Sequence, residues 1–359
     1  MSGAEERQAG RWRPATLARL DPGYFALTMA TGIVSTAVGQ AGHQHLSGVL
    51  LVVSLGCFAV LLVCYAWRAA AFPHRMLADL RAPERAFAFL TFVAACDVLA
   101  VRLAADGHHG VTLALVVVAL PTWFMLGYGV PMRLIAGSRA APVLAGVNGT
   151  WFMWVVGTQS LAAAVAVLER ALQGPARPEA LVAVLLWSVG VVLYLLIATL
   201  VLVRLLLIDV GPDDLAPPYW VAMGATAITV FAAAHVLHMA DSPVLAAIRP
   251  AVAGLAVVLW AFGTWLIPML VMFAVWGSVR TESHRSRLRY HPALWSAVFP
   301  LGMYAAASIE VGTALGLPLV QGIGRIWVWV AATAWAFTAA AMIGTVLRWA
   351  TSLRRARRS

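Results

Sequence analysis

The chain has 359 residues, of which 62% are hydrophobic and only 11% are charged. A water-soluble protein of this size cannot bury that much apolar surface, so the composition excludes a soluble globular protein and indicates a polytopic membrane protein. Lysine is absent, and the formal net charge of +10 rests on arginines that cluster between apolar runs. Such clusters are typical of a basic cytoplasmic membrane face, so we expect no nucleic-acid partner.

Ten apolar segments follow one another along the chain and predict an all-α protein with ten transmembrane helices. The loops between them are short, so we expect one ten-helix transmembrane domain over residues 21–349, flanked by basic cytoplasmic tails at 1–20 and 350–359. The segments cover residues 22–40, 47–71, 84–105, 110–135, 143–168, 180–207, 218–238, 250–278, 293–316 and 322–349.

The arginines predict how the chain is oriented in the cell membrane. Twenty of the 25 lie in the N-terminus, in the loops that follow even-numbered segments, and in the C-terminus. Because loops rich in arginine stay in the cytoplasm, both termini are expected on the cytoplasmic side.

The side-chain sizes predict which helices lie inside. The odd-numbered segments 22–40, 218–238 and 293–316 are rich in Gly, Ala, Ser and Thr, whereas 47–71 and 180–207 are dominated by Val and Leu. Small side chains allow close approach of helices or leave open space, and large aliphatic ones suit lipid contact. We therefore expect odd helices inside and even helices mostly outside, with the small-residue tenth segment as an exception.

The ninth segment is a candidate pore element. Pro300 removes a backbone donor and is expected to bend the helix, while Gly302 and the alanines from 305 to 307 leave one face nearly bare. Phe299 is the one large ring that could project across this bare region. Two interpretations remain open: Phe299 and Pro300 form a pore gate, or the segment is a kinked packing helix.

Three stretches together resemble the tellurite-resistance/dicarboxylate transporter family, which includes the plant slow anion channels. They are Pro22-Gly-Tyr-Phe-Ala-Leu-Thr-Met-Ala-Thr-Gly32, Pro217-Pro-Tyr-Trp-Val-Ala-Met-Gly-Ala225 and Trp295-Ser-Ala-Val-Phe-Pro-Leu-Gly302. The resemblance covers residues from about 20 to 350 and implies five helical hairpins around a central pore lined by odd helices, commonly as a homotrimer. It also implies that Phe299 occludes the pore and that small anions are transported. One departure is that Pro300 is the only helix-breaking proline in an odd segment, so Gly32, Gly157 and Gly224 would have to supply other bends.

Asp97 lies in the middle of the third segment, where an unpaired carboxylate is costly and is a functional candidate by default. Arg102 is five residues away, about 140° around the helix, and is a poor partner. Asp97 either takes up a proton that couples to anion movement or ties helices together as a hydrogen-bonded carboxyl.

Other polar side chains are further candidates for coupling or substrate binding. His235 and His238 share a face near the outer end of the seventh segment and suit pH sensing; a metal site with Asp241 is the less favoured alternative. Glu310 is expected to pair with a histidine or with Arg325. Asn148, Thr150, Thr158 and Gln159 on the fifth segment offer uncharged donors, either to a passing anion or to neighbouring helices.

The sequence carries no nucleotide-binding loop, nucleophile elbow or zinc signature, so we expect neither catalysis nor a cofactor. The favoured function is a secondary active transporter of dicarboxylates or related oxyanions such as malate, sulfite or tellurite. The alternative is a passive, gated chloride or nitrate channel with no coupled proton. A membrane scaffold or sensor that transports nothing is the third possibility.

Overall fold

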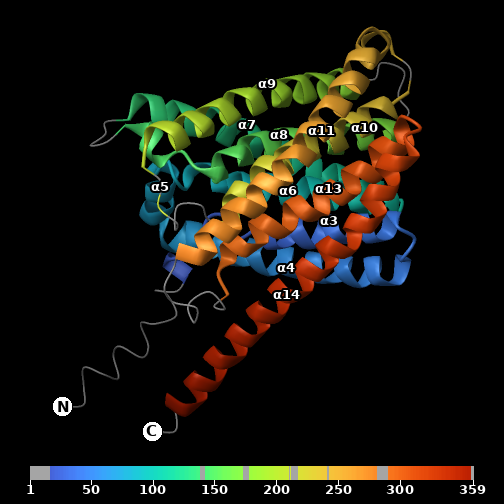
Figure 1. Cartoon of the computed structure of the whole chain (residues 1–359). Coiled ribbons are helices and arrows are strands. Elements are labelled where there is room, and N and C mark those ends of the chain that lie inside the picture. Colours follow the sequence, from blue (N-terminus) through green and yellow to red (C-terminus); the bar gives the residue numbers. More distant parts are fainter. Residues whose placement is uncertain are drawn as a thin grey trace, which may run out of the picture.

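The computed structural model describes residues 17–137, 142–172, 178–209, 211, 217–240, 242–280 and 290–356. Over these residues the protein consists of helices and contains no strand, in agreement with the predicted class. The long helices, shown in Figure 1, are α3 (Ala26–Gln40), α4 (Gln44–Ala71), α6 (Thr91–Ala105), α7 (His109–Ala136), α8 (Phe152–Leu172), α9 (Pro178–Leu207), α10 (Val221–Leu237), α11 (Pro243–Arg280), α13 (Trp295–Ala314) and α14 (Pro318–Ala356).

Within the described residues, nine helical stretches are long and apolar enough to cross a membrane. The predicted segment that is missing from these nine is the first, residues 22–40, which corresponds to α3 and has only 15 residues. It is short because a turn occupies residues 22–25, stabilised by the Gly23 amide, which donates to Asp21 Oδ1 at 2.8 Å. The eighth segment is longer than predicted: α11 begins at Pro243, where Ser242 Oγ caps the Leu245 amide at 3.2 Å, and Pro250 lies inside it.

The helices form two concentric layers of five. Consecutive helices pair as the antiparallel hairpins α3/α4, α6/α7, α8/α9, α10/α11 and α13/α14. The first member of each hairpin also packs against the first members of two others, in the closed order α3, α6, α8, α10, α13 and back to α3. The result is an inner ring of five parallel helices, each backed by one outer helix (Figure 1).

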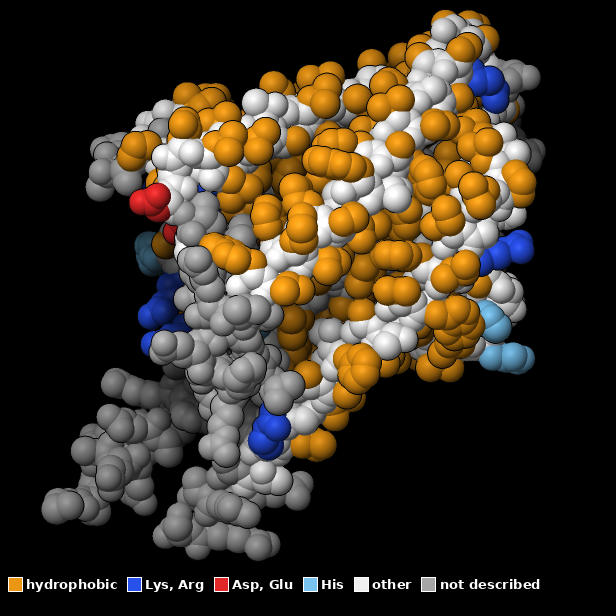
Figure 2. All heavy atoms as spheres, viewed as in Figure 1, with side chains coloured by type: hydrophobic (Ala, Val, Ile, Leu, Met, Phe, Trp, Pro, Cys, Tyr) orange, Lys and Arg blue, Asp and Glu red, His pale blue; other side chains and the backbone are white. Residues whose placement is uncertain are grey.

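Burial separates the two layers and confirms the prediction made from side-chain size. The inner spans that contain α6, α8, α10 and α13 are 72–94% buried, and 13 of the 15 residues of α3 are buried. The outer spans are only 17–44% buried, and Figure 2 shows the apolar side chains that cover this outer surface. A belt of exposed Val, Leu and Phe is costly in water and suits the hydrocarbon core of a bilayer, so this is a polytopic membrane protein.

The tenth segment, the compositional exception, lies in the outer layer as α14. Its small residues allow close packing on α13: a Cβ added at Gly324 would lie 2.8 Å from the Ile309 amide nitrogen and 2.9 Å from the Ala305 carbonyl oxygen. The helix also continues to Ala356, into the region predicted as the C-terminal tail.

Short 3₁₀ helices precede four of the inner helices. They are η1 (Ala86–Leu90), η3 (Gly149–Trp151), η4 (Pro217–Trp220) and η5 (Pro292–Leu294), while η2 (Val143–Gly146) lies before η3. Prolines at the start of η4 and η5 favour these turns because their fixed φ suits the first turn of a helix. Consequently α6 begins at Thr91 rather than at the predicted residue 84.

The glycines expected to bend inner helices have another role. Gly32, Gly157 and Gly224 each lie within an unbroken helix at a helix–helix contact. A Cβ at Gly224 would lie 2.8 Å from Cγ of Pro300, so this glycine makes room for the proline ring that projects from α13. Pro300 is the only proline inside an inner helix of the described chain, as predicted.

Candidate functional site

Three cavities follow the axis of the inner ring. The proximal vestibule, of about 400 Å³, lies where the inner helices begin and includes Gly23, Thr91, Met153, Val221 and Ser296 in its lining. The distal vestibule, of about 660 Å³, lies where they end. Between them is a central cavity of about 10 Å³, lined by Ile33, Thr36, Asp97, Val98, Val101, Ser160, Ala163, Ile228, Phe231 and Met303. Because this lining includes side chains from all five inner helices, the central cavity lies on the ring axis.

Asp97 projects into the central cavity and is fully buried. Ser160 Oγ donates a hydrogen bond to Asp97 Oδ2 at 2.9 Å, whereas Oδ1 has no hydrogen-bond partner among the described residues. The cavity has about the volume that one water molecule needs. Arg102 turns away, as its spacing predicted, and bonds Ser35, Ser47 and Asp106 instead. Ser160 was missed at the sequence level, although it belongs to the same polar run as Gln159.

Phe299 is fully buried on α13. It comes three residues after Ser296, which lines the proximal vestibule, and four before Met303, which lines the central cavity. Residues three or four apart share a helix face, so this spacing predicts that Phe299 lies on the axis-facing side of α13, at a level between the two cavities. Phe299 is not part of the lining of either cavity. Pro300, the next residue, packs against Gly224 of α10.

Phe231 defines a second narrow section, which the sequence analysis did not identify. It lines both the central cavity and the distal vestibule, together with Thr36 and Val101. Its ring contacts the imidazole of His235 edge-on, with ring centroids 4.5 Å apart. Phe231 therefore lies between the central cavity and the distal vestibule.

The distal vestibule collects charged and titratable groups at the C-terminal ends of the inner helices. Its lining includes the predicted residues His235, His238 and Glu310, with Arg102, Asp106, His109 and Arg170 in addition. His235 Nδ1 lies 3.4 Å from Arg170 Nη2, and its Nε2 has no partner in the described part of the chain. Glu310 accepts a hydrogen bond from Gln40 Nε2 at 2.6 Å rather than pairing with a histidine or Arg325. No group of three metal-ligating side chains occurs among the described residues, which do not include Asp241.

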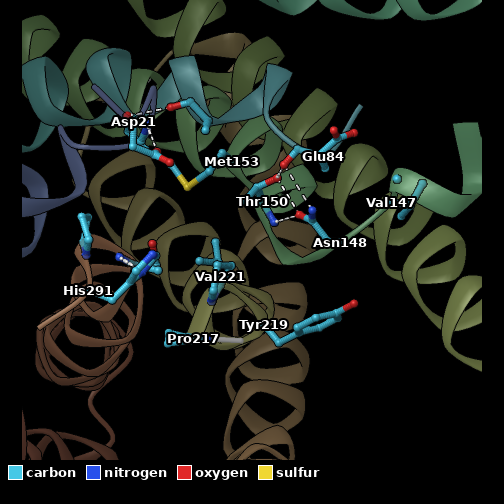
Figure 3. Close-up of a pocket in the computed structure, with 18 of the residues that line it drawn as sticks. Asp21, Glu84, Val147, Asn148, Thr150, Met153, Pro217, Tyr219, Val221 and His291 are labelled. Atoms are coloured by element: carbon cyan, nitrogen blue, oxygen red, sulfur yellow. Dashed lines mark hydrogen bonds between the residues drawn. The ribbon is translucent and has the colours of Figure 1, made fainter. Parts of the chain in front are cut away.

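The uncharged candidates on the fifth segment separate into two sets. Asn148 and Thr150 line the proximal vestibule, where Asn148 Oδ1 accepts from the Thr150 amide at 2.8 Å and Nδ2 donates to the Glu84 carbonyl at 3.2 Å (Figure 3). Gln159 instead turns toward α9 and donates to the Trp187 carbonyl at 3.1 Å. Thr158 accepts from Trp123 Nε1 of α7 at 2.8 Å. These contacts favour helix pairing for Gln159 and Thr158.

The proximal vestibule is lined by both polar and charged groups. In Figure 3, Asp21 lies at the upper left and His291 at the lower left, and Glu84 is next to Asn148. Arg204 of α9 is buried in the lining and lies 3.4 Å from the hydroxyl of Tyr219. Arg204 could not be assigned to this site from the sequence, because its position depends on the contact with Tyr219 of η4, which forms only in the folded bundle.

The chain is similar to membrane proteins and transporters from distant organisms. It is 52% identical over 151 residues to an uncharacterized membrane protein of Mycobacterium tuberculosis, covering 42% of this chain and 75% of that protein. It is 25% identical to an uncharacterized transporter of Methanocaldococcus jannaschii, covering 88% and 90% of the two chains. Over 93% and 92% of the two chains, it is 22% identical to a sulfite efflux pump of Arthroderma otae.

The family model described as voltage-dependent anion channel matches residues 19–343. This range takes in all five inner helices and both vestibules. The match agrees with the resemblance found in the three sequence stretches and with the arrangement of five hairpins in two layers. The chain therefore belongs to the voltage-dependent anion channel family.

Proposed function

We propose that the chain transports small anions along the axis of the inner ring, from one vestibule to the other. The observation that carries the proposal is the alignment of three cavities inside a closed ring of helices. The inner helices are parallel, so their N-terminal ends converge on the proximal vestibule. These ends carry the positive poles of the helix dipoles and favour anions. At the opposite ends, Arg102 and Arg170 supply positive charge in the last helical turns.

In this proposal Phe299 and Pro300 form the gate. By helical spacing, the other inner helices place small residues such as Ala94 and Ala225 opposite the ring, between the proximal vestibule and the central cavity. A phenyl ring among small side chains forms a hydrophobic constriction, which an ion cannot pass without replacing its lost hydration shell. The packing of Gly224 on Pro300 holds the helix segment that bears the ring.

The proposed substrates are oxyanions or dicarboxylates, among them sulfite, malate and tellurite. Sulfite is supported by the name of the Arthroderma otae relative, a sulfite efflux pump. Guanidinium groups match the geometry of oxyanions and carboxylates, and both Arg102 and Arg170 line the distal vestibule.

Transport is proposed to be coupled to protons through Asp97. A buried carboxylate with one unpartnered oxygen, in a cavity that could hold one water molecule, is a natural proton acceptor on the axis. The alternative is a passive gated anion channel, favoured by the otherwise uncharged lining of the central cavity. In the channel, Asp97 would only tie α6 to α8 through Ser160.

The experiment that tests this function is a flux panel with purified protein in liposomes, using malate, succinate, sulfite, nitrate and chloride at two pH values. Proton movement locked to anion movement would support the carrier. Anion flux without proton movement would support the channel. Absence of flux for every anion would reject transport and favour a scaffold or sensor.

The arginine distribution further supports a location in the cell membrane with both termini cytoplasmic. This would make the proximal vestibule the cytoplasmic one. The family resemblance also supports a homotrimer, which light scattering of the detergent-solubilised protein, corrected for bound detergent, would test.

A further inference from the structure

A fourth pocket lies outside the ring, where α4 ends and the short helix α5 (Pro73–Arg81) begins. It has a volume of about 380 Å³ and is lined by Ala18, Arg19, Arg68, Arg75, Ala78, Asp79 and Arg85. The lining holds four arginines and one carboxylate, a formal net charge of +3. Arg85 also pairs with Asp21 outside the lining, with 3.5 Å between Nη2 and Oδ2. Figure 2 shows basic side chains gathered on the side of the molecule where Figure 1 labels α5. None of the lining residues belongs to the proposed anion pathway.

Arg68 is the buried centre of this pocket, with only 2% of its surface exposed. Its Nη2 donates to the Asp79 carboxylate and lies 3.5 Å from the Ala18 carbonyl oxygen. Its Nε and Nη1 are buried without a hydrogen-bond partner among the described residues. Leaving charged donors unpaired in a buried position is costly, so the arrangement favours an additional anionic group as their acceptor.

Asp79 cannot neutralise the pocket, because its carboxylate is shared. Arg85 Nη1 donates to Asp79 Oδ1 at 2.7 Å while Arg68 occupies Oδ2. At the rim, Arg19 and Arg75 are exposed, and no ion pair of the described chain involves either of them. Several guanidinium groups around one opening match a phosphate group, whose oxygens accept many charge-assisted hydrogen bonds.

The surroundings of the pocket favour a lipid as the source of that phosphate. Val60, Val63 and Trp67 form one exposed stripe on α4, and each is 62–65% exposed. The stripe reaches the level of Arg68, which lies on the buried face of the same helix with Leu61 and Tyr65. An exposed apolar stripe ending in tryptophan is typical of the boundary between hydrocarbon and headgroups. Acyl chains lying along this stripe would bring a headgroup to the level of the arginines.

We propose that this pocket binds the phosphate group of an anionic phospholipid, with Arg68 at its centre and Arg19 and Arg75 at its rim. The site is independent of the anion pathway and would be occupied whether or not transport takes place.

The test compares two double variants of the full-length protein in neutral detergent. Arg19→Gln/Arg75→Gln removes the two rim charges and leaves the Arg68–Asp79 ion pair intact, so folding is not at stake. Arg81→Gln/Arg133→Gln is the matched control, since Arg81 and Arg133 are also exposed and line none of the pockets described above. Native mass spectrometry measures the Kd of short-chain phosphatidylglycerol, short-chain phosphatidylcholine and inorganic phosphate for each protein.

Phosphatidylglycerol should bind the wild type and the control alike, and bind the rim variant about 25-fold more weakly, roughly fivefold for each guanidinium removed. Phosphatidylcholine, whose headgroup has no net charge, should bind weakly to all three. The proteins could instead bind inorganic phosphate but not phosphatidylglycerol, with the same loss of affinity in the rim variant. That result would show that the pocket binds phosphate but that a phospholipid is not its source. Equal affinities of the rim variant and the control for both anionic probes would overturn the proposal.

Discussion

Phe299 allows the gate to be distinguished from ordinary packing, because the two roles predict opposite changes in flux. Phe299→Ala should raise anion flux per folded protein if the ring closes the path between the proximal vestibule and the central cavity. A purely structural phenylalanine at this fully buried position would instead lower stability by about 3–5 kcal/mol, and flux would fall with the amount of folded protein. Liposome flux and thermal stability, measured on the same preparation, separate these outcomes.

Phe152→Ala is the matched control for this substitution. Phe152 is also buried on an inner helix, but its ring contacts Tyr194 of the outer helix α9, with ring centroids 5.6 Å apart. The control should lose stability without gaining flux. A marked stability loss with unchanged or reduced flux for Phe299→Ala would remove this residue from the gate.

Substitution of Asp97 tests whether anion transport is coupled to protons. Asp97→Asn keeps a group that can accept the hydrogen bond from Ser160 but cannot exchange a proton, so the fold should persist while pH-dependent uptake is lost. Glu310→Gln, at a carboxyl in the distal vestibule, serves as the control and should keep the pH dependence. If the flux through the Asp97→Asn protein varies with pH as in the wild type, Asp97 has only a structural role, and the passive channel is favoured.

At the scale of the element, α13 and α14 pack closely only because of glycine. Gly324→Ala should destabilise the protein by about 1–3 kcal/mol, since the new methyl would meet the backbone of α13 at Ile309 and Ala305. Gly322→Ala, two residues earlier on the same helix, meets nothing within 4 Å and should be neutral or slightly stabilising. Thermal unfolding in detergent measures both, and equal stabilities would contradict the close packing.

The sequence predicted the helices and their layers better than the directions of their polar side chains. Lipid contact selects Leu and Val along whole outer helices such as α9, so composition indicated the layers, with α14 as the exception. Which way a polar side chain points depends on the rotation of its helix, and that rotation is set by neighbours distant in the sequence. Gln159 and Ser160 are adjacent, yet one faces α9 and the other faces Asp97.

The residues at which the inner helices begin could also not be predicted from the sequence. The 3₁₀ turns that shift α6 to Thr91 depend on contacts among η1, η3 and η4, which meet only in the folded bundle. The pairing of Glu310 with Gln40 joins α13 to α3 across 270 residues of sequence and carries no local signal. By contrast, helix geometry alone predicted that Arg102 does not form an ion pair with Asp97.

For the whole molecule, the two-layer architecture requires an even number of crossings, because each inner helix returns through an outer one. Reporter fusions placed after Ser359 and within residues 106–110 should therefore report opposite sides of the membrane, with the first in the cytoplasm. Finding both reporters on the same side would contradict this topology. A signal from Ser359 on the non-cytoplasmic side, together with a cytoplasmic one from the loop, would reverse the proposed orientation.

The short sealed section between the two vestibules also determines where the membrane voltage acts. In the proposed pathway, water and mobile ions in the vestibules would conduct, so most of the electrical potential would drop between Phe299 and Phe231, and Asp97 would lie within that drop. Moving one elementary charge through all of it changes the free energy by about 2.3 kcal/mol per 100 mV. The apparent proton affinity of coupled transport should therefore shift with an imposed potassium-diffusion potential, and Asp97→Asn should abolish that shift. A wild-type flux whose proton coupling ignores the imposed voltage would show that Asp97 exchanges its proton outside the field.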